Sequence, residues 1–252
     1  MPFEALYVLA AGFAAGVINA IAGGGKLLVL PALMAAGISP YAANITSSLV
    51  LFPGAASAVW QYRHELGKLP ARYYACLVPC FAGALIGIVL LQHTSSDIFE
   101  KLAPWLILFA LACFALQPYI LNRFRLSLPT AGSIGYTTLV ILFISSVYGG
   151  YFGAGYGFIF MAILSLVANL RVYQLSGLKN IMGGGMELMA VIYFAVTRGI
   201  VWQAGLLAML GCIAGGICGA RYALRLPQPR VRIAVTTIGL AVTCTAFWHA
   251  YA

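Results

Sequence analysis

Apolar segments long enough to cross a lipid bilayer follow one another along almost the whole chain, separated by short polar connectors. A helix needs about 20 apolar residues to span the hydrocarbon core. Inside lipid the backbone must satisfy its own hydrogen bonds, which restricts such a chain to helices or a closed barrel. The pattern predicts an all-α polytopic membrane protein with about eight transmembrane helices. The expected spans are approximately 4–36, 40–62, 70–92, 99–120, 133–167, 171–197, 200–222 and 230–251.

Composition excludes several other classes of protein. Hydrophobic residues make up 63% of the 252 positions and charged residues only 8%, too few charges to cover the surface of a soluble domain. The net charge of +9 comes from 14 basic and 5 acidic residues. The basic residues are scattered in connectors, which favours anionic lipid headgroups over nucleic acid as their partners. The N-terminal residues lack a basic region and a cleavage site, so we expect the first span to be retained.

Two expected spans, the first and the fifth, are too long for one straight crossing. Each contains glycines near its middle: Gly23, Gly24 and Gly25 in the first, and a run from Gly149 to Gly157 in the fifth. Because glycine allows the backbone to leave the helical conformation, each segment is expected to be a broken helix or a re-entrant pair of half-helices.

The two halves of the chain resemble each other. The segment 80–87 (CFAGALIG) matches 212–219 (CIAGGICG) at a displacement of 132 residues, which also pairs Gly67 with Gly199. Near the start of each half the displacement is 130, pairing Gly23 with Gly153. We interpret this as one integral membrane domain made of a four-helix repeat at 1–121, a connector at 122–132 and a second repeat at 133–252. Internal repeats with broken helices in matching positions are typical of transporters, whose binding site lies between them.

Lys26 follows the first glycine run inside an apolar span, where a lysine costs at least roughly 2.5 kcal/mol. The half-helix after the break would direct its positive N-terminal end, and the N–H groups of Gly23, Gly24 and Gly25, toward an anion. Lys26 would add a full charge there. The alternative is a lysine at a helix end whose ammonium group extends to the lipid headgroups.

A polar cluster early in the second span supplies further candidates for binding an anion. Asn44, Thr46 and Ser47 can donate hydrogen bonds to anionic oxygens. Ordinary hydrogen bonding between membrane helices explains them equally well. Ser47 and Ser48 stand opposite Lys179 and Asn180 at the displacement of 132, which favours binding.

Lys179, Asn180 and Glu187 form a third cluster in the sixth expected span. Eight positions separate Lys179 from Glu187, about 80° around an unbroken helix, so the two could share a cavity. Glu187 is either a proton-coupling carboxylate or a structural partner for a lysine. Glycines at 183, 184 and 185 favour a break in this helix as well.

Catalytic and metal-binding patterns do not stand out in the sequence. The six cysteines lie in apolar stretches without a C-x-x-C pair, and the three histidines have no partner at catalytic spacing. We therefore expect neither an enzyme nor a metal or other cofactor.

Several of these motifs together resemble the sulfite exporter TauE/SafE family. That family runs from a glycine-rich helix through a Gly-Gly-Gly break and a proline to a Thr-Ser step that opens the next helix. The matching segments are 12–16 (GFAAG), 22–25 (AGGG), Pro31, 44–48 (NITSS), 62–64 (YRH) and Gly67. The chain departs from the family pattern at Lys26 and at Lys179-Asn180, where small residues are expected, and both changes add positive charge.

The resemblance implies a secondary transporter of a small sulfur oxyanion or organosulfonate, such as sulfite, thiosulfate or sulfoacetate, in the bacterial inner membrane. An anion channel and a carboxylate transporter are the alternatives. The partners expected are a small anion, the lipid bilayer and a coupled proton or ion, with homo-oligomerisation left open. Lys and Arg counts over eight crossings give no orientation.

Overall fold

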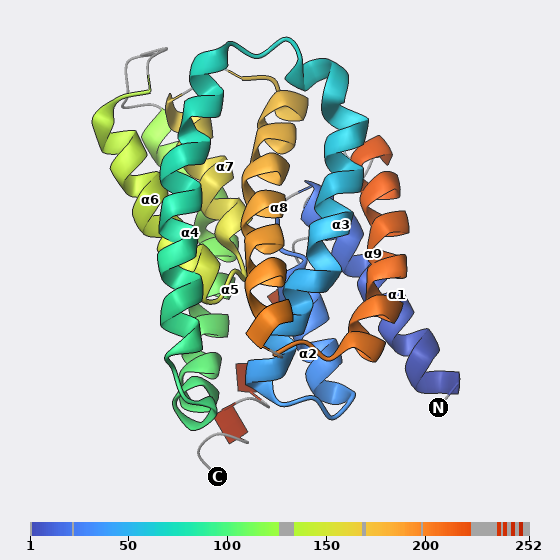
Figure 1. The fold of residues 1–252 in the computed structure, drawn as a ribbon. Coiled ribbons are helices and arrows are strands. Elements are labelled where there is room, and N and C mark those ends of the chain that lie inside the picture. The colour runs from blue at the N-terminus through green and yellow to red at the C-terminus, as the bar shows by residue number, and fades with distance from the viewer. Residues whose placement is uncertain are drawn as a thin grey trace.

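The described part of the chain is a bundle of helices. A computed structural model describes residues 2–21, 23–125, 134–167, 170–197, 199–222, 236–237, 239–240, 243–244 and 247–248, with no strand among them. Figure 1 shows the arrangement. In chain order the elements are α1 (Pro2–Ile21), α2 (Lys26–Ala35), α3 (Pro40–Leu66), the 3-10 helix η1 (Ala71–Cys76), α4 (Leu77–Gln92), α5 (Ser96–Arg125), α6 (Tyr136–Tyr151), α7 (Tyr156–Val167), α8 (Val172–Thr197) and α9 (Trp202–Tyr222).

Length and hydropathy make four helical segments of the described chain able to cross a membrane. They are Pro40–Leu66, Ala71–Gln92, Val172–Thr197 and Trp202–Tyr222. Large apolar side chains such as Val78, Ile192 and Leu210 are exposed on the outer faces of these helices, as expected for contact with lipid. The prediction of an all-helical polytopic membrane protein is confirmed. The last expected span, 230–251, lies mostly outside the described residues, so the eighth helix stays a prediction.

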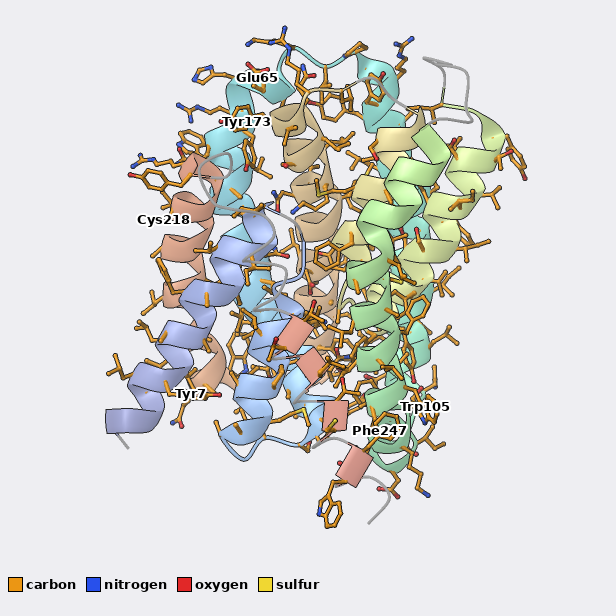
Figure 2. The ribbon with its side chains drawn as sticks, turned by 180° about the vertical axis from the view of Figure 1, so that it is seen from behind. Tyr7, Glu65, Trp105, Tyr173, Cys218 and Phe247 are labelled. Carbon is orange, nitrogen blue, oxygen red and sulfur yellow. The ribbon has the colours of Figure 1, made fainter. Side chains whose placement is uncertain are left out.

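Contacts between segments that are distant in the sequence identify the two ends of the bundle. At one, the Glu65 end, Arg171 before α8 lies 3.9 Å from the Glu65 carboxylate. At the other, the Tyr41 end, the Tyr41 hydroxyl donates to the Leu91 carbonyl oxygen at 3.4 Å. Figure 2 shows Glu65 and Tyr173 at the first end and Trp105 and Phe247 at the second.

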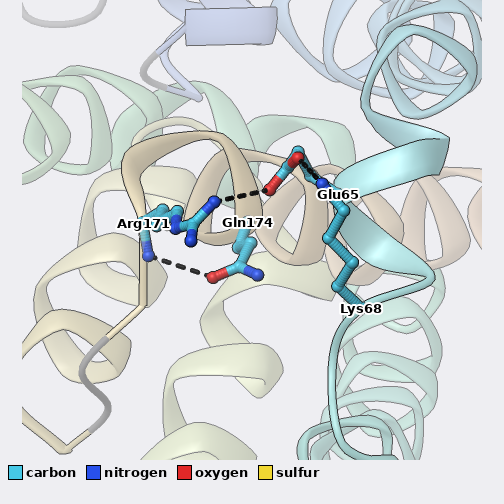
Figure 3. A network of polar contacts seen from close by, with 4 residues as sticks. All are labelled: Glu65, Lys68, Arg171 and Gln174. Atoms are coloured by element: carbon cyan, nitrogen blue, oxygen red, sulfur yellow. Dashed lines mark hydrogen bonds and ion pairs between the residues drawn. The ribbon is translucent and has the colours of Figure 1, made fainter.

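The Glu65 end carries a small polar network that joins two connectors. Glu65 binds Lys68 and Arg171, and the Arg171 backbone N–H donates to Gln174 Oε1 at 3.1 Å (Figure 3). The network links the end of α3 to the start of α8. Ion pairs as exposed as these contribute little to stability, because water and salt screen them.

Local sequence explains where the long helices begin and end. Ser39 accepts a hydrogen bond from the Ala42 N–H and Pro40 occupies the first turn, so α3 starts with a standard cap. Gly67 then closes α3 through its N–H to the Arg63 carbonyl oxygen at 3.0 Å.

The first and fifth expected spans are each two helices that turn back on themselves. The chain leaves α1 after Ile21 and returns as α2, so that a Cβ built on Gly25 would lie 2.6 Å from the Ala15 carbonyl oxygen. In the same way α6 ends at Tyr151 and α7 starts at Tyr156. Figure 1 shows that the α1–α2 hairpin starts and returns at the Tyr41 end, while the α6–α7 hairpin starts and returns at the Glu65 end. The structure thus has two re-entrant hairpins that approach the centre from opposite ends.

The prediction of a third break, at the glycines of α8, is wrong. α8 runs from Val172 to Thr197 without interruption. Its glycines make room for neighbours instead: a Cβ on Gly183 would overlap the Tyr156 hydroxyl, and one on Gly185 would overlap the Phe81 ring. Three adjacent glycines lower helix propensity, but packing on several sides outweighs that loss.

Close helix packing repeats between the halves at the displacements seen in the sequence. Gly83 of α4 lies against the Phe143 carbonyl oxygen of α6, and Gly215 of α9 lies against the Phe13 carbonyl oxygen of α1. The glycines are 132 residues apart and the carbonyls 130. In the first half α4 packs on α6 of the second half, and in the second half α9 packs on α1 of the first. Small residues at the interfaces of membrane helices allow such close packing. The four-helix repeats at 1–121 and 133–252 stay a prediction.

Candidate functional site

The tips of the two hairpins touch each other. Gly23 has a φ of +88°, and a Cβ built there would lie 2.5 Å from Gly157 Cα. A side chain at Gly23 is therefore excluded both by its backbone conformation and by its neighbour. The breaks that the sequence places in separate halves meet at one point of the bundle.

Lys26 lies at this meeting point, as the first residue of α2. It is 4% exposed, and within the described part of the chain its one hydrogen bond runs from Nζ to Ser48 Oγ of α3 at 3.4 Å. A Cβ built on Gly153, in the other hairpin, would lie 3.0 Å from Lys26 Nζ. The structure therefore places a buried ammonium group between the α6–α7 break and α3, and leaves it weakly bonded. The alternative, an ammonium group extended to the headgroups, does not fit this burial.

Both half-helices that start at the tips direct their N-terminal ends inward. α2 begins at Lys26 and α7 begins at Tyr156, 130 residues later. Free N–H groups and the positive end of the helix dipole favour negative charge at such a point. Of the backbone donors expected from Gly23, Gly24 and Gly25, the Gly23 N–H is already used, because it donates to the Ile18 and Asn19 carbonyl oxygens at the end of α1. Gly24 and Gly25 directly precede Lys26 at the start of α2.

Lys179 has a different environment. It is 1% exposed, and its Nζ donates to the backbone carbonyl oxygen of Asn19 and, at 3.2 Å, to Asn180 Oδ1. Asn180 Nδ2 in turn donates to the Ala20 carbonyl oxygen at 3.1 Å. The last carbonyls of a helix have no partner within it. Lys179 and Asn180, both predicted to bind substrate, together satisfy the end of α1.

Asn44 bonds to the break of the other hairpin, α6–α7, as Asn180 bonds to the break of α1–α2. Its Nδ2 donates to the Tyr151 carbonyl oxygen, at the end of α6, at 3.2 Å. Each hairpin is thus fastened at its break by an asparagine from a long helix of the other half. Asn44 Oδ1 is buried without a hydrogen-bond partner.

The other two predicted residues of the α3 cluster bond to the protein. Thr46 Oγ1 accepts the N–H of Val201, just before α9, at 3.0 Å. Ser47 Oγ donates to the Asn44 carbonyl oxygen of its own helix at 2.6 Å. The structure brings Ser48, rather than Thr46 or Ser47, to Lys26.

Glu187 of α8 lies close enough to Lys26 and Tyr156 to act on both electrostatically. It is 4% exposed, and its Oε1 has no hydrogen-bond partner among the residues that the structure describes. No ion pair within 4.0 Å joins Glu187 to a lysine in the described chain. On the continuous helix, Lys179, Gly183 and Glu187 follow one another at intervals of four residues, and the Tyr156 hydroxyl lies against Gly183. Glu187 is therefore a buried acid near the hairpin tips.

Sequence reasoning placed Ser48 in the polar cluster of the second span but not among the predicted ligand residues. It did not identify Tyr156 or the carbonyl of Asn19 as parts of the site. Tyr156 could have been found, because it is the counterpart of Lys26 at the displacement of 130. The role of the Asn19 carbonyl depends on how far the Lys179 side chain reaches between helices, which no pattern in the sequence shows.

Re-entrant half-helices that meet inside a bundle of membrane-spanning helices, with buried charges at their tips, define a multi-pass membrane transporter. Comparison with known proteins gives the family: the sulfite exporter TauE/SafE family model matches residues 8–245, and the chain belongs to that family. The predicted resemblance is confirmed.

Curated relatives cover nearly the whole chain. A probable membrane transporter protein, ORF9, of Sinorhizobium sp is 28% identical over 95% of this chain and 92% of its own length. A probable membrane transporter protein of Haemophilus influenzae is 28% identical over 92% and 90%, respectively. The probable membrane transporter protein YfcA of Escherichia coli is 24% identical over 94% and 87%. None of these names specifies a substrate.

Proposed function

We propose that the protein is a secondary transporter of a small anion, a sulfur oxyanion or an organosulfonate, in the inner membrane of a bacterium. The observation that carries the proposal is Lys26: a buried ammonium group with one long hydrogen bond, at the point where two re-entrant hairpins meet. An anion bound there would compensate a charge that is otherwise expensive inside a membrane.

The surroundings of Lys26 suit a compact anion with several oxygens. Ser48 can donate from its hydroxyl, and the starts of α2 and α7 offer backbone N–H groups. Family membership supports a sulfur-containing anion, since the family is described as sulfite exporters. The same donors would also bind a carboxylate, so a carboxylate transporter remains the alternative.

Transport in this proposal follows from the two hairpins. The halves at 1–121 and 133–252 each contribute one hairpin, and opposed repeats of this kind alternate access around a fixed site. Glu187, buried and near Lys26, is the candidate group for coupling to a proton. In an anion channel the same charges would line a continuous water path instead.

Transport by purified protein in proteoliposomes tests the proposal. Wild-type protein is expected to take up one member of a panel of sulfite, thiosulfate, sulfoacetate, acetate and chloride, saturably, and Lys26→Met to abolish that uptake. Lys68→Met is the matched control, because Lys68 lies on the exposed Glu65 network. Accumulation against a concentration gradient when a proton gradient is imposed identifies a transporter, whereas flux that only dissipates gradients identifies a channel. Equal uptake by wild type and Lys26→Met contradicts the proposed site.

A further inference from the structure

Two buried oxygen atoms near Lys26 accept no hydrogen bond from the described chain. They are Asn44 Oδ1 and Glu187 Oε1. The two residues are 1% and 4% exposed, so bulk water does not solvate them. Buried polar atoms are normally paired, and an unpaired one calls for an explanation, such as a functional role or a bound water or ion.

The orientation of the Asn44 amide is fixed by its other atom. Its nitrogen donates to the Tyr151 carbonyl oxygen, so the free atom is the oxygen, which can only accept. Ser48, one turn further along α3, binds Lys26. Lys26 Nζ and Asn44 therefore both reach the α6–α7 break, and the free oxygen belongs to the surroundings of the ammonium group.

Glu187 adds a second acceptor from the opposite helix. Among the titratable groups near it are Lys26 of α2, Tyr156 of α7 and Cys212 of α9, on all of which it acts electrostatically. No hydrogen bond joins any of these three side chains to Glu187 in the described chain. The site thus combines an ammonium donor on one side with two unpaired acceptors.

A simple anion fits only half of these groups. Its oxygens would pair with Lys26 and Ser48, but they would also face a carboxylate and an amide oxygen, and acceptors that face acceptors repel. We infer that the ligand is an anion that carries its own N–H or O–H donor, such as a hydroxy- or amino-substituted sulfonate. The anionic group binds Lys26, and the donor binds Glu187 or Asn44 Oδ1. This inference rests on the proposed function and specifies its substrate class.

Three small sulfonates of similar size test the inference: ethanesulfonate, 2-hydroxyethanesulfonate and 2-aminoethanesulfonate. Their sulfonate groups stay ionised at every pH used. The hydroxy compound adds a neutral O–H donor to ethanesulfonate, whereas the amino compound adds an ammonium donor and is a zwitterion. Binding to wild-type protein in detergent, measured by calorimetry at neutral and at mildly acidic pH, is expected to be at least about tenfold tighter for one of the two donor-bearing ligands than for ethanesulfonate. A site built to bind a donor rejects the analogue that lacks it.

Substitution of Glu187 tests whether its carboxylate is the group that accepts the ligand's hydrogen bond. Glu187→Gln is expected to reduce the preference for the donor-bearing ligand at least fivefold and to strengthen binding of ethanesulfonate, because a negative charge is removed. Glu65→Gln makes the same chemical change at the exposed network and is expected to leave all three affinities unchanged. The wild-type series remains decisive if Glu187→Gln does not fold.

The remaining outcomes separate the inference from the proposed function. Equal affinity for all three ligands, lost in Lys26→Met, overturns the inference and leaves the anion site standing. Binding of ethanesulfonate that strengthens at the lower pH shows that Glu187 itself takes up the proton, and also overturns it. No binding of any sulfonate or of the transport panel overturns both.

Discussion

Gly23 and Gly157 meet backbone to backbone, with 2.5 Å between Gly157 Cα and a Cβ built on Gly23. They belong to different hairpins that come from opposite ends of the bundle (Figure 1). The contact holds the α1–α2 break against the start of α7, and with it the position of Lys26 relative to Gly153. The geometry of the candidate site therefore depends on two residues without side chains.

Gly23→Ala is expected to lower the melting temperature in detergent and to abolish transport. Alanine at a positive φ costs roughly 1–2 kcal/mol, and the overlap with Gly157 adds to that. Gly37→Ala is the matched control: Gly37 has a φ of +83° with nothing within 4 Å of a built Cβ. It measures the backbone cost alone, so equal melting temperatures for the two variants would contradict the importance of the contact.

Lys179→Met is expected to destabilise the protein more than Lys26→Met does. Removing the Lys179 ammonium group breaks its hydrogen bonds to Asn180 Oδ1 and to the Asn19 carbonyl oxygen, which keeps the Gly23 N–H as a donor. A hydrogen bond to a charged group contributes about 1.5–3 kcal/mol. Lys26 gives up only one bond of 3.4 Å. Thermal unfolding of both variants, with anion binding measured alongside, checks this: a fully stable Lys179→Met that has lost binding would make Lys179 a ligand residue instead.

Gly83→Ala and Gly215→Ala are expected to be destabilising to a similar extent. Each added methyl group would overlap a backbone carbonyl of the facing helix, and overpacking typically costs about 1–3 kcal/mol. Gly67→Ala serves as the control, since the nearest atom to a Cβ there is 3.5 Å away. The measurement is the melting temperature. A large effect at only one of the two positions would speak against equivalent interfaces in the two halves.

Thr46→Val is expected to cost about 1 kcal/mol of stability while anion affinity stays within twofold of wild type. Its hydroxyl holds the Val201 N–H at the start of α9 and does not contact Lys26. Parallel measurements of unfolding and of ligand binding distinguish this role from the one the sequence predicts. A variant with normal stability and lost binding would restore Thr46 to the site.

The sequence predicts much of the fold because membrane helices leave a strong pattern. Apolar segments between charged connectors locate α3, α8, α9 and the pair η1–α4 to within a few residues, and the glycine runs locate both hairpins. The break expected in α8 fails for a physical reason. Glycine permits a break but also permits close packing, and only the neighbours, here Tyr156 and Phe81, decide between the two.

The candidate site is less predictable, because function there depends on which partner each polar group finds. Lys26 and Lys179 look alike in the sequence: each is a lysine next to glycines in an apolar span. In the structure Lys179 donates to the Asn19 carbonyl oxygen at the end of α1, while Lys26 donates to the Ser48 hydroxyl. Contacts between helices about 160 residues apart separate the two roles.

The hairpins also determine which connectors share a face of the membrane. Each returns to the end where it started and adds no crossing. Among the described side chains outside the hairpins, basic residues then gather at the Glu65 end, namely Arg63, Lys68, Arg72, Arg171 and Arg221, against Lys101 alone at the Tyr41 end. Because connectors rich in Lys and Arg stay in the cytoplasm, the Glu65 end is expected to face it.

Cysteine labelling of intact cells checks this orientation. In a variant without native cysteines, Gly67→Cys is expected to react only with membrane-permeant thiol reagents, and Ser95→Cys is expected to react with impermeant reagents as well. The reverse result would invert the orientation.

In that orientation each hairpin is anchored to one compartment. The α1–α2 hairpin, which carries Lys26, is anchored at the outer face, and the α6–α7 hairpin, with Gly153 beside Lys26, at the cytoplasmic face. A displacement of the outer hairpin would carry the charge with it, whereas a displacement of the inner hairpin would leave the charge in place and uncover it. The two faces of the membrane would therefore reach the same lysine by unlike movements, so inward and outward transport need not have equal rates.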